Sequence, residues 1–257
     1  MEYRSIADAR TLDGLRLILT AGVPGPWSES AKAVFRVRSV PYTPIAQELG
    51  GDNEEQVKWL GIRNAPVALY NDEKPRSGWA EILFLAERLG SGPSLIPGDP
   101  FDRALMFGLA HEIAGEDGLG WCRRLLIVSG PIEAGPEHPA HGFARFFGDN
   151  YGYTPGAAVA AAKRSRDILA LLSDQLARQQ AAGKRYLVGD ALSAVDIYWV
   201  AFANMIDPMP HALCPMSDDF RAMYSGSPPE VRAAASPALL AHRDFVAGQA
   251  YELPFAF

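Results

Sequence analysis

The sequence predicts an α/β domain followed by an all-helical domain, and two observations support this division. Within the first 90 residues, short apolar runs typical of buried strands alternate with segments whose apolar residues recur at helical spacing. After a stretch rich in Gly, Pro and Ser, the apolar residues recur mainly at helical spacing. We therefore predict an α/β domain over 1–90, a linker over 91–98 and a helical domain over 99–257.

In the first domain, strands and helices are expected to alternate. The strands are expected at 15–20, 42–47 and 66–70, and the helices at 28–39, 53–60 and 79–89. A further short strand before the last of these helices is left open. Ser28 is placed where its side chain could cap the first helix.

In the second domain, only helices are expected. They are predicted at 101–113 after an Asp99 cap, 157–180, 193–206 and 237–248. The segment 130–155 contains several Gly–Pro and His–Pro pairs and is predicted to be a long structured loop. The apolar tail 251–257 is expected to dock on the body of the protein or to lie over a cleft.

The composition is that of a globular protein and excludes several functions. The 257 residues are 48% hydrophobic and 21% charged, which is typical of a chain with a full core. A net charge of −6 argues against a nucleic-acid partner. No apolar stretch approaches the roughly 20 residues that span a bilayer, and the N-terminus does not resemble a signal peptide. We therefore expect no membrane partner and a cytoplasmic location.

The candidate metal ligands are few and scattered. His138 and His141 have no third partner nearby, and Cys122 and Cys214 form no CxxC pair. We therefore expect no metal.

Ser193 and Asp196 have the spacing of a capping box, with Asp in place of the usual Glu. The segment that follows, 197–202, is too apolar to face water, so it is expected to form the core of the helical domain. The expected role of both residues is structural.

Residues 186–198, Tyr-Leu-Val-Gly-Asp-Ala-Leu-Ser-Ala-Val-Asp-Ile-Tyr, resemble the segment that starts the buried core helix of cytosolic glutathione transferases. Only Val195 departs from the family pattern, which has Ala there. The resemblance implies a thioredoxin-like N-terminal domain followed by the all-helical C-terminal domain of glutathione transferases. It also implies a homodimer that uses glutathione as co-substrate.

The residues 25–28, Gly-Pro-Trp-Ser, occupy the place where the family contacts the glutathione sulfur. Gly25 has no side chain, so disulfide reduction is not expected. Ser28 is then the remaining hydroxyl of this segment. It could be a helix cap alone, or a cap that also contacts the thiolate; in the second case it is the catalytic residue, with the Trp27 amide beside it. Ala65 and Pro66 resemble the family's cis-proline motif, which implies a backbone contact with the cysteinyl part of glutathione.

One segment departs from the family. Arg76, Ser77 and Gly78 lie where a Glu-Ser pair holds the γ-glutamyl end of glutathione, and the acid is missing. Ser77 could still offer a hydroxyl, and Arg76 could pair with a carboxylate.

In the family, the first helix of the second domain lines the pocket for the electrophile, so Met106, Phe107 and His111 are the weak candidates there. Two functions follow from these comparisons. The first is transfer of the glutathione thiolate to a small hydrophobic electrophile. The second is a non-catalytic binding protein on the same fold that has lost the usual glutathione grip.

Overall fold

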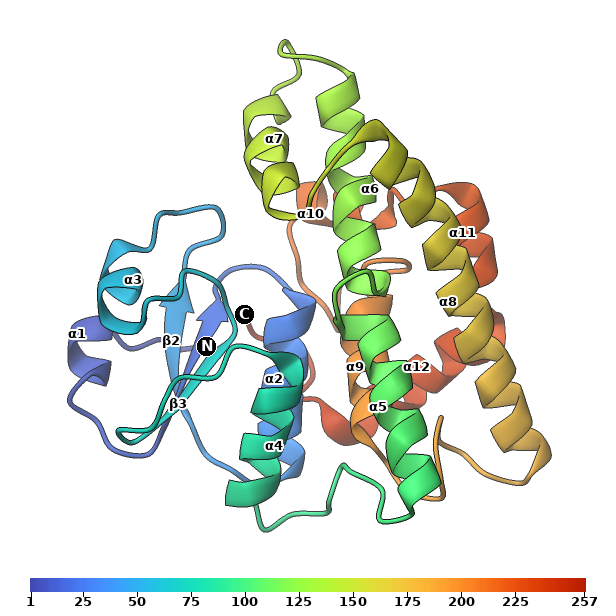
Figure 1. Cartoon of the computed structure of the whole chain (residues 1–257), viewed down its shortest axis with the longest axis horizontal. Coiled ribbons are helices and arrows are strands. Elements are labelled where there is room, and N and C mark those ends of the chain that lie inside the picture. The colour runs from blue at the N-terminus through green and yellow to red at the C-terminus, as the bar shows by residue number, and fades with distance from the viewer.

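The computed structural model describes residues 1–257, and its N-terminal half is built on a small mixed sheet (Figure 1). The strands are β1 (Leu15–Thr20), β2 (Thr43–Gln47) and β3 (Val67–Tyr70), in the order β2-β1-β3. β1 pairs in parallel with β2 and antiparallel with β3. The segment before α4, for which a further strand was left open, forms an isolated β-bridge between Ala68 and Arg76 and no strand.

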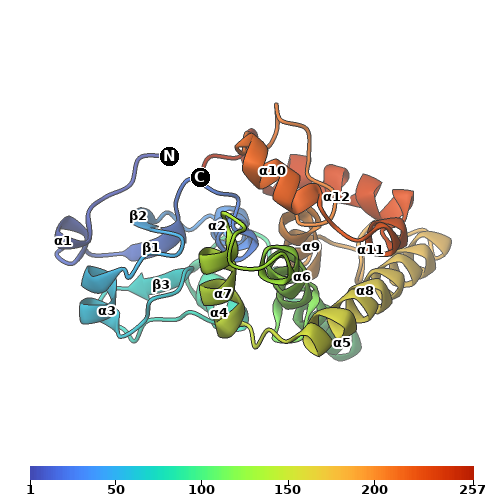
Figure 2. The same ribbon diagram turned by 90° about the horizontal axis from the view of Figure 1, so that it is seen from above.

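Helices cover both faces of this sheet. They are α1 (Ile6–Ala9), α2 (Pro26–Val37), α3 (Glu54–Leu60) and α4 (Trp79–Leu89). Because side chains alternate along a strand, β1 sends Leu17 and Leu19 into the main core and Ile18 into a small cluster beneath α1 and α3. α2 and α4 lie between the sheet and the C-terminal helices (Figure 2).

The C-terminal half is entirely helical. Its helices are α5 (Pro100–Ala114), α6 (Leu119–Glu133), α7 (His141–Asn150), α8 (Pro155–Ala181), α9 (Ala194–Ala203), α10 (Asp218–Ser225), α11 (Pro229–Ala234) and α12 (Pro237–Ala250). As predicted, Asp99 caps α5 by accepting from the amides of Phe101 and Asp102. No helix is long and apolar enough to cross a membrane.

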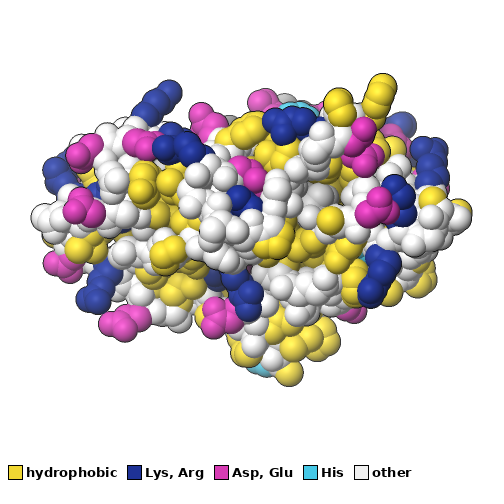
Figure 3. Space-filling view, turned by 90° about the horizontal axis from the view of Figure 1, so that it is seen from below, with side chains coloured by type: hydrophobic (Ala, Val, Ile, Leu, Met, Phe, Trp, Pro, Cys, Tyr) yellow, Lys and Arg dark blue, Asp and Glu magenta, His cyan; other side chains and the backbone are white.

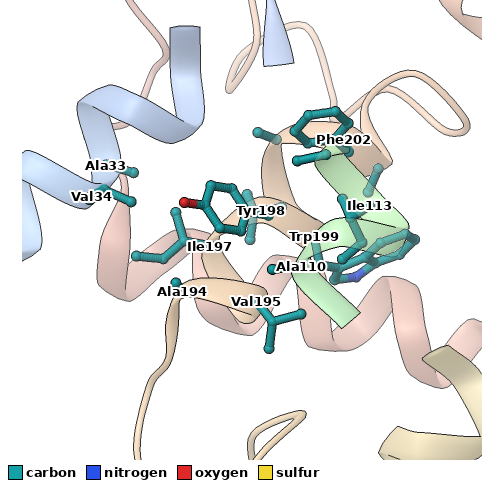
Figure 4. Packing of buried hydrophobic residues seen from close by; sticks show 14 of the residues in the cluster. Ala33, Val34, Ala110, Ile113, Ala194, Val195, Ile197, Tyr198, Trp199 and Phe202 are labelled. Atoms are coloured by element: carbon teal, nitrogen blue, oxygen red, sulfur yellow. The ribbon is translucent and has the colours of Figure 1, made fainter. Parts of the chain in front are cut away.

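α9 is the centre of the protein, and every one of its residues is buried. It packs against α2 from the first half and against α5 and α12. In Figure 4, Ile197 and Tyr198 lie toward Ala33 and Val34 of α2, whereas Trp199 lies beside α5. The core helix predicted from its composition is thus shared by both halves of the chain.

The predicted capping box is present at the start of α9. The Asp196 carboxylate accepts from the amide and the hydroxyl of Ser193, at 3.0 and 2.9 Å. It also accepts from the amide of Leu187 and from Nε2 of His242, both at 2.8 Å. A buried carboxylate therefore ties α9 to α12 and to the preceding segment.

The prediction of a long loop over 130–155 is wrong. α6 extends to Glu133, α7 occupies His141–Asn150, and α8 begins at Pro155, where the Thr154 side chain accepts from the Ala157 amide. The Gly and Pro residues that suggested a loop stand mainly at helix ends and in the short connection between α6 and α7. Pro155 is the first residue of α8, where a missing N–H has no cost.

Side chains also hold the linker and the C-terminal tail in place. Arg38 at the end of α2 donates to the carbonyls of Glu87, Gly90 and Gly92, which fixes the segment after α4. The C-terminal tail docks on the body, since the Tyr251 hydroxyl donates to the Ile197 carbonyl at 2.7 Å.

Candidate functional site

A cavity of about 470 Å³ opens between the two halves of the chain. Its first wall is formed by the ends of β1 and β2, the start of α2 and the loops before β3 and α4. Its second wall is formed by the end of α5, by α6 and by α7. The volume is in the range of ordinary small-molecule sites.

Ser28 lines the cavity, but it does not cap the helix. α2 begins earlier than predicted, with Gly25 as N-cap and Pro26 as its first residue, so Ser28 lies in the first turn. Its hydroxyl accepts from the amide of Thr20 at 3.1 Å. The distance from this hydroxyl to Oγ1 of Thr20 is 3.5 Å, which is long for an O–H···O bond. The Ser28 hydroxyl therefore donates at most a weak hydrogen bond within the protein.

The start of α2 is suited to hold an anion. The first amides of a helix have no intrahelical acceptor, and the helix dipole adds positive potential there. Gly25, Trp27 and Ser28 all line the cavity at this point. A thiolate in this part of the cavity would be stabilised by both effects.

Ala65, Pro66 and Ser77 also line the cavity, on the loops before β3 and α4. The peptide bond between Ala65 and Pro66 is cis, as the resemblance implied. The structure thus brings five of the six predicted sulfur and glutathione contacts to one wall.

Arg76 is the exception. Its guanidinium donates to Oε2 of Glu73 at 2.7 Å and to the carbonyl of Lys74, and the residue does not line the cavity. The same Glu73 carboxylate pairs with Arg88, and the hydrogen bonds from both arginines lower its pKa. The structure therefore places Arg76 away from the cavity wall, because a carboxylate three residues away already holds it.

Of the three candidates on α5, only His111 lines the cavity. Met106 is fully buried in the main core, and Phe107 stacks on Phe84 with ring centroids 5.4 Å apart. Only the last turn of α5 reaches the cavity, so the structure does not bring Met106 and Phe107 to its wall.

The second wall is aromatic and contains a cation. Its side chains come from α6, α7 and the residue after α7: Trp121, Arg124, Phe146, Phe147 and Tyr151. Trp121 and Tyr151 meet edge to face at 4.7 Å. The Arg124 guanidinium lies over Trp27 of the first wall at 5.8 Å and over Phe147 at 5.3 Å.

Trp27 joins the two walls. Its indole N–H donates to the Ala114 carbonyl at 2.9 Å, and its ring meets Phe202 of α9 edge to face at 4.8 Å. Gly120 leaves the space for this contact, because a Cβ at that position would come within 2.3 Å of Phe202 and 2.8 Å of Trp27.

The two cysteines offer no nucleophile to the site. Both are buried and free, and burial raises the pKa of each thiol to about 12. The structure also contains no group of three or more His, Cys, Asp or Glu side chains placed to hold a metal ion.

No family model matches the chain. A stretch of 90 residues is 22% identical to glutathione S-transferase U9 of Arabidopsis thaliana, and this match covers 35% of the chain and 38% of that protein. Structural likeness extends over nearly the whole chain. The β-etherase LigF of Sphingobium sp. strain SYK-6 is 19% identical with a TM-score of 0.63, over 92% of this chain and 96% of LigF.

Two further solved structures are similar. A glutathione S-transferase domain-containing protein of Marinobacter aquaeolei VT8 is 18% identical with a TM-score of 0.61, over 91% of this chain and 98% of that one. A glutathione S-transferase of Methylobacterium radiotolerans JCM 2831, solved with glutathione sulfonate, is 17% identical with a TM-score of 0.60, over 91% of each chain. The chain has the glutathione-transferase fold.

Within this glutathione-transferase fold, sequence reasoning missed most of the second wall. Trp121 and Arg124 belong to α6, for which no helix was predicted, and Phe146 and Phe147 lie in the supposed loop. A usable signal was present, because Phe143, Phe147 and Tyr151 recur every four residues, as on one face of a helix.

Proposed function

We propose that this protein binds glutathione in the cavity between its two halves and joins glutathione, through its sulfur, to a small hydrophobic electrophile. The observation that carries the proposal is the convergence of the α2 N-terminus, the Ser28 hydroxyl and the loop at Ala65 and Pro66 on one wall. A structural neighbour with glutathione sulfonate bound supports the choice of ligand.

Ser28 and the start of α2 would hold the sulfur as a thiolate. The Ser28 hydroxyl would donate to it, and the helix dipole would lower the pKa of the bound thiol. The thiolate would then attack a carbon of an electrophile that packs against the aromatic second wall, so that a C–S bond forms and the leaving group departs with the electron pair of the bond that breaks. Positioning the two reactants and lowering the thiol pKa are the contributions expected from the protein.

The alternative is a binding protein without catalysis, and the segment 76–78 favours it. No acid stands at the place of the family's Glu-Ser pair, and Arg76 is held by Glu73. Ser77 is left as the polar side chain of this segment that lines the cavity.

A calorimetric titration with glutathione and a turnover assay with 1-chloro-2,4-dinitrobenzene separate these functions. Millimolar or tighter binding together with turnover supports the transferase. Binding without turnover supports the binding protein. No binding at millimolar glutathione would contradict the transferase and favour a binding protein that has lost the glutathione grip.

We also propose a homodimer, because apolar side chains are exposed on α4 and α5. Phe84 is 47% exposed, Phe101 86% and Leu105 40%. The molecular face seen from below carries hydrophobic side chains among its charged ones (Figure 3). The expected result is a dimer mass by light scattering that Phe101→Asp reduces to a monomer mass, whereas a monomer in the unsubstituted protein would contradict the proposal.

A further inference from the structure

The arginine side chains in the interior differ in one respect. Five arginines are buried: Arg16, Arg38, Arg123, Arg124 and Arg243. Four of them donate at least two hydrogen bonds to carbonyl or carboxylate oxygens. Arg124 makes no ion pair and no hydrogen bond to a carbonyl or carboxylate oxygen; its polar contact is with the Tyr224 hydroxyl, and its buried Nε, like those of Arg16 and Arg38, has no hydrogen-bond partner.

The Arg124 guanidinium lies on the wall of the cavity, where aromatic rings hold it. The residue is 7% exposed, and its charge lies over the rings of Trp27 and Phe147. Burial raises the pKa of the neighbouring Tyr224 phenol, and the Arg124 charge opposes that rise. None of these neighbours carries a negative charge at neutral pH.

The protein does not supply an anion for this cation. Glu116 is the single acidic residue that lines the cavity, it is exposed, and it forms no ion pair with Arg124. A buried guanidinium without a counter-ion is costly, and its planar set of donors matches a carboxylate in a bidentate pair. The missing partner is therefore expected in a ligand.

The remaining side chains of the second wall indicate the chemistry of the rest of that ligand. Trp121, Phe146, Phe147 and Tyr151 present aromatic surface to the same cavity. Flat aromatic molecules pack well on such rings, edge to face or stacked with an offset. The site thus combines the Arg124 cation with an aromatic lining; a second arginine, Arg63, also lines the cavity, with its guanidinium over Phe146 at 5.1 Å.

We propose that this part of the cavity binds a small aromatic carboxylate, with the carboxylate paired to Arg124. The proposal rests on the proposed function for the ligand's role as co-substrate, but binding itself does not require glutathione. Arg124 is then a residue that determines specificity, since it distinguishes an acid from its neutral analogue.

The test compares 2-naphthoate with 2-naphthamide, which have nearly the same shape and differ in charge at pH 7. Binding is followed by calorimetry and by quenching of tryptophan fluorescence, because Trp27, Trp79 and Trp121 line the cavity. We expect the unsubstituted protein to bind the acid on the order of tenfold to a hundredfold more tightly than the amide. Equal affinities would overturn the proposal without any variant.

Arg124→Met keeps the apolar stem and removes the charge. It should lower naphthoate affinity to that of naphthamide and leave naphthamide affinity unchanged. Arg124→Lys, which keeps the charge but loses the fork, should give an intermediate affinity and serves if the Met variant does not fold. Arg185→Met is the matched control, because Arg185 also stacks on an aromatic ring, Phe245, but lies outside the cavity.

Glutathione titrations of the same proteins separate this inference from the proposed function. If Arg124→Met weakens glutathione as much as naphthoate, the guanidinium holds the tripeptide and the inference is overturned. If the protein does not bind glutathione but binds naphthoate in a way that depends on Arg124, the inference is supported and the proposed transferase function is contradicted.

Discussion

Asp196 and Arg124 are both buried charges in the helical half of the chain, and they are treated in opposite ways. The Asp196 carboxylate is fully buried and accepts four hydrogen bonds. The Arg124 guanidinium lies between aromatic rings and donates none to a carbonyl or carboxylate. The difference teaches that a buried charge whose hydrogen bonds are all made within the protein has a structural role, whereas a buried charge that lacks such partners and lies beside a cavity is available to a ligand.

The largest effect is expected at Asp196. Asp196→Ala should lower the free energy of unfolding by about 3–5 kcal/mol, because it leaves two amides, a hydroxyl and His242 without their acceptor. Urea denaturation measures the change. Asp190→Ala, at an exposed side chain, should change stability by less than about 0.5 kcal/mol. Equal stability of the two variants would contradict the structural role of Asp196.

Two adjacent arginines on α6 provide the second test. Arg123 donates to the carbonyls of Met205 and Tyr224, so Arg123→Met should cost about 2–4 kcal/mol. Arg124→Met breaks no hydrogen bond to a carbonyl or carboxylate and should change stability by less than about 1 kcal/mol, or increase it. Thermal unfolding of both variants without ligand gives the answer. A larger loss for Arg124→Met would show that its role is structural.

Ser28 is intermediate between these extremes, since its hydroxyl is well paired on one side only. Ser28→Ala should cost about 1–3 kcal/mol of stability, because the Thr20 amide loses its acceptor. If the hydroxyl also donates to the glutathione sulfur, the pKa of the bound thiol should rise by about 1–2 units.

The pKa of bound glutathione is read from the thiolate absorbance as a function of pH. Ser28→Asp serves as the comparison, because a carboxylate would repel the sulfur and raise the thiol pKa further. The same thiol pKa in all three proteins would leave Ser28 a structural role and assign the sulfur to the amides at the start of α2.

The smallest effect is expected at Gly25. This N-cap residue makes no side-chain hydrogen bond, and a Cβ there would meet only ordinary contacts, the nearest at 3.6 Å. Gly25→Ser should stabilise the protein by a few tenths of a kcal/mol, because the Ser side chain can accept from a first-turn amide of α2. Thermal unfolding measures the change, and an unchanged or lower stability would contradict this explanation.

The sequence predicted the parts of the fold that depend on local patterns. The apolar run in β1, the periodicity of α4 and the capping box of α9 each appear where they were expected. α2 begins earlier than predicted, because Pro26 at the first helical position is a stronger signal of a helix start than Ser28 as a cap.

The cavity was only half predictable, for a physical reason. Its first wall follows from short segments such as Ala65 and Pro66 that resemble a family motif. The contact of Arg124 with Trp27 joins residues far apart in the chain, and it depends on how α6 packs beside α2. No local pattern contains that information.

The burial of α2 against α9 has a consequence during synthesis. The apolar face that carries Ala33 and Val34 leaves the ribosome long before Ala194–Ala203 can cover it. The nascent N-terminal half therefore exposes a hydrophobic helix face while much of the chain is still being made, a state prone to aggregation. The protein's yield in a cell should then depend on chaperones that protect this face until α9 arrives.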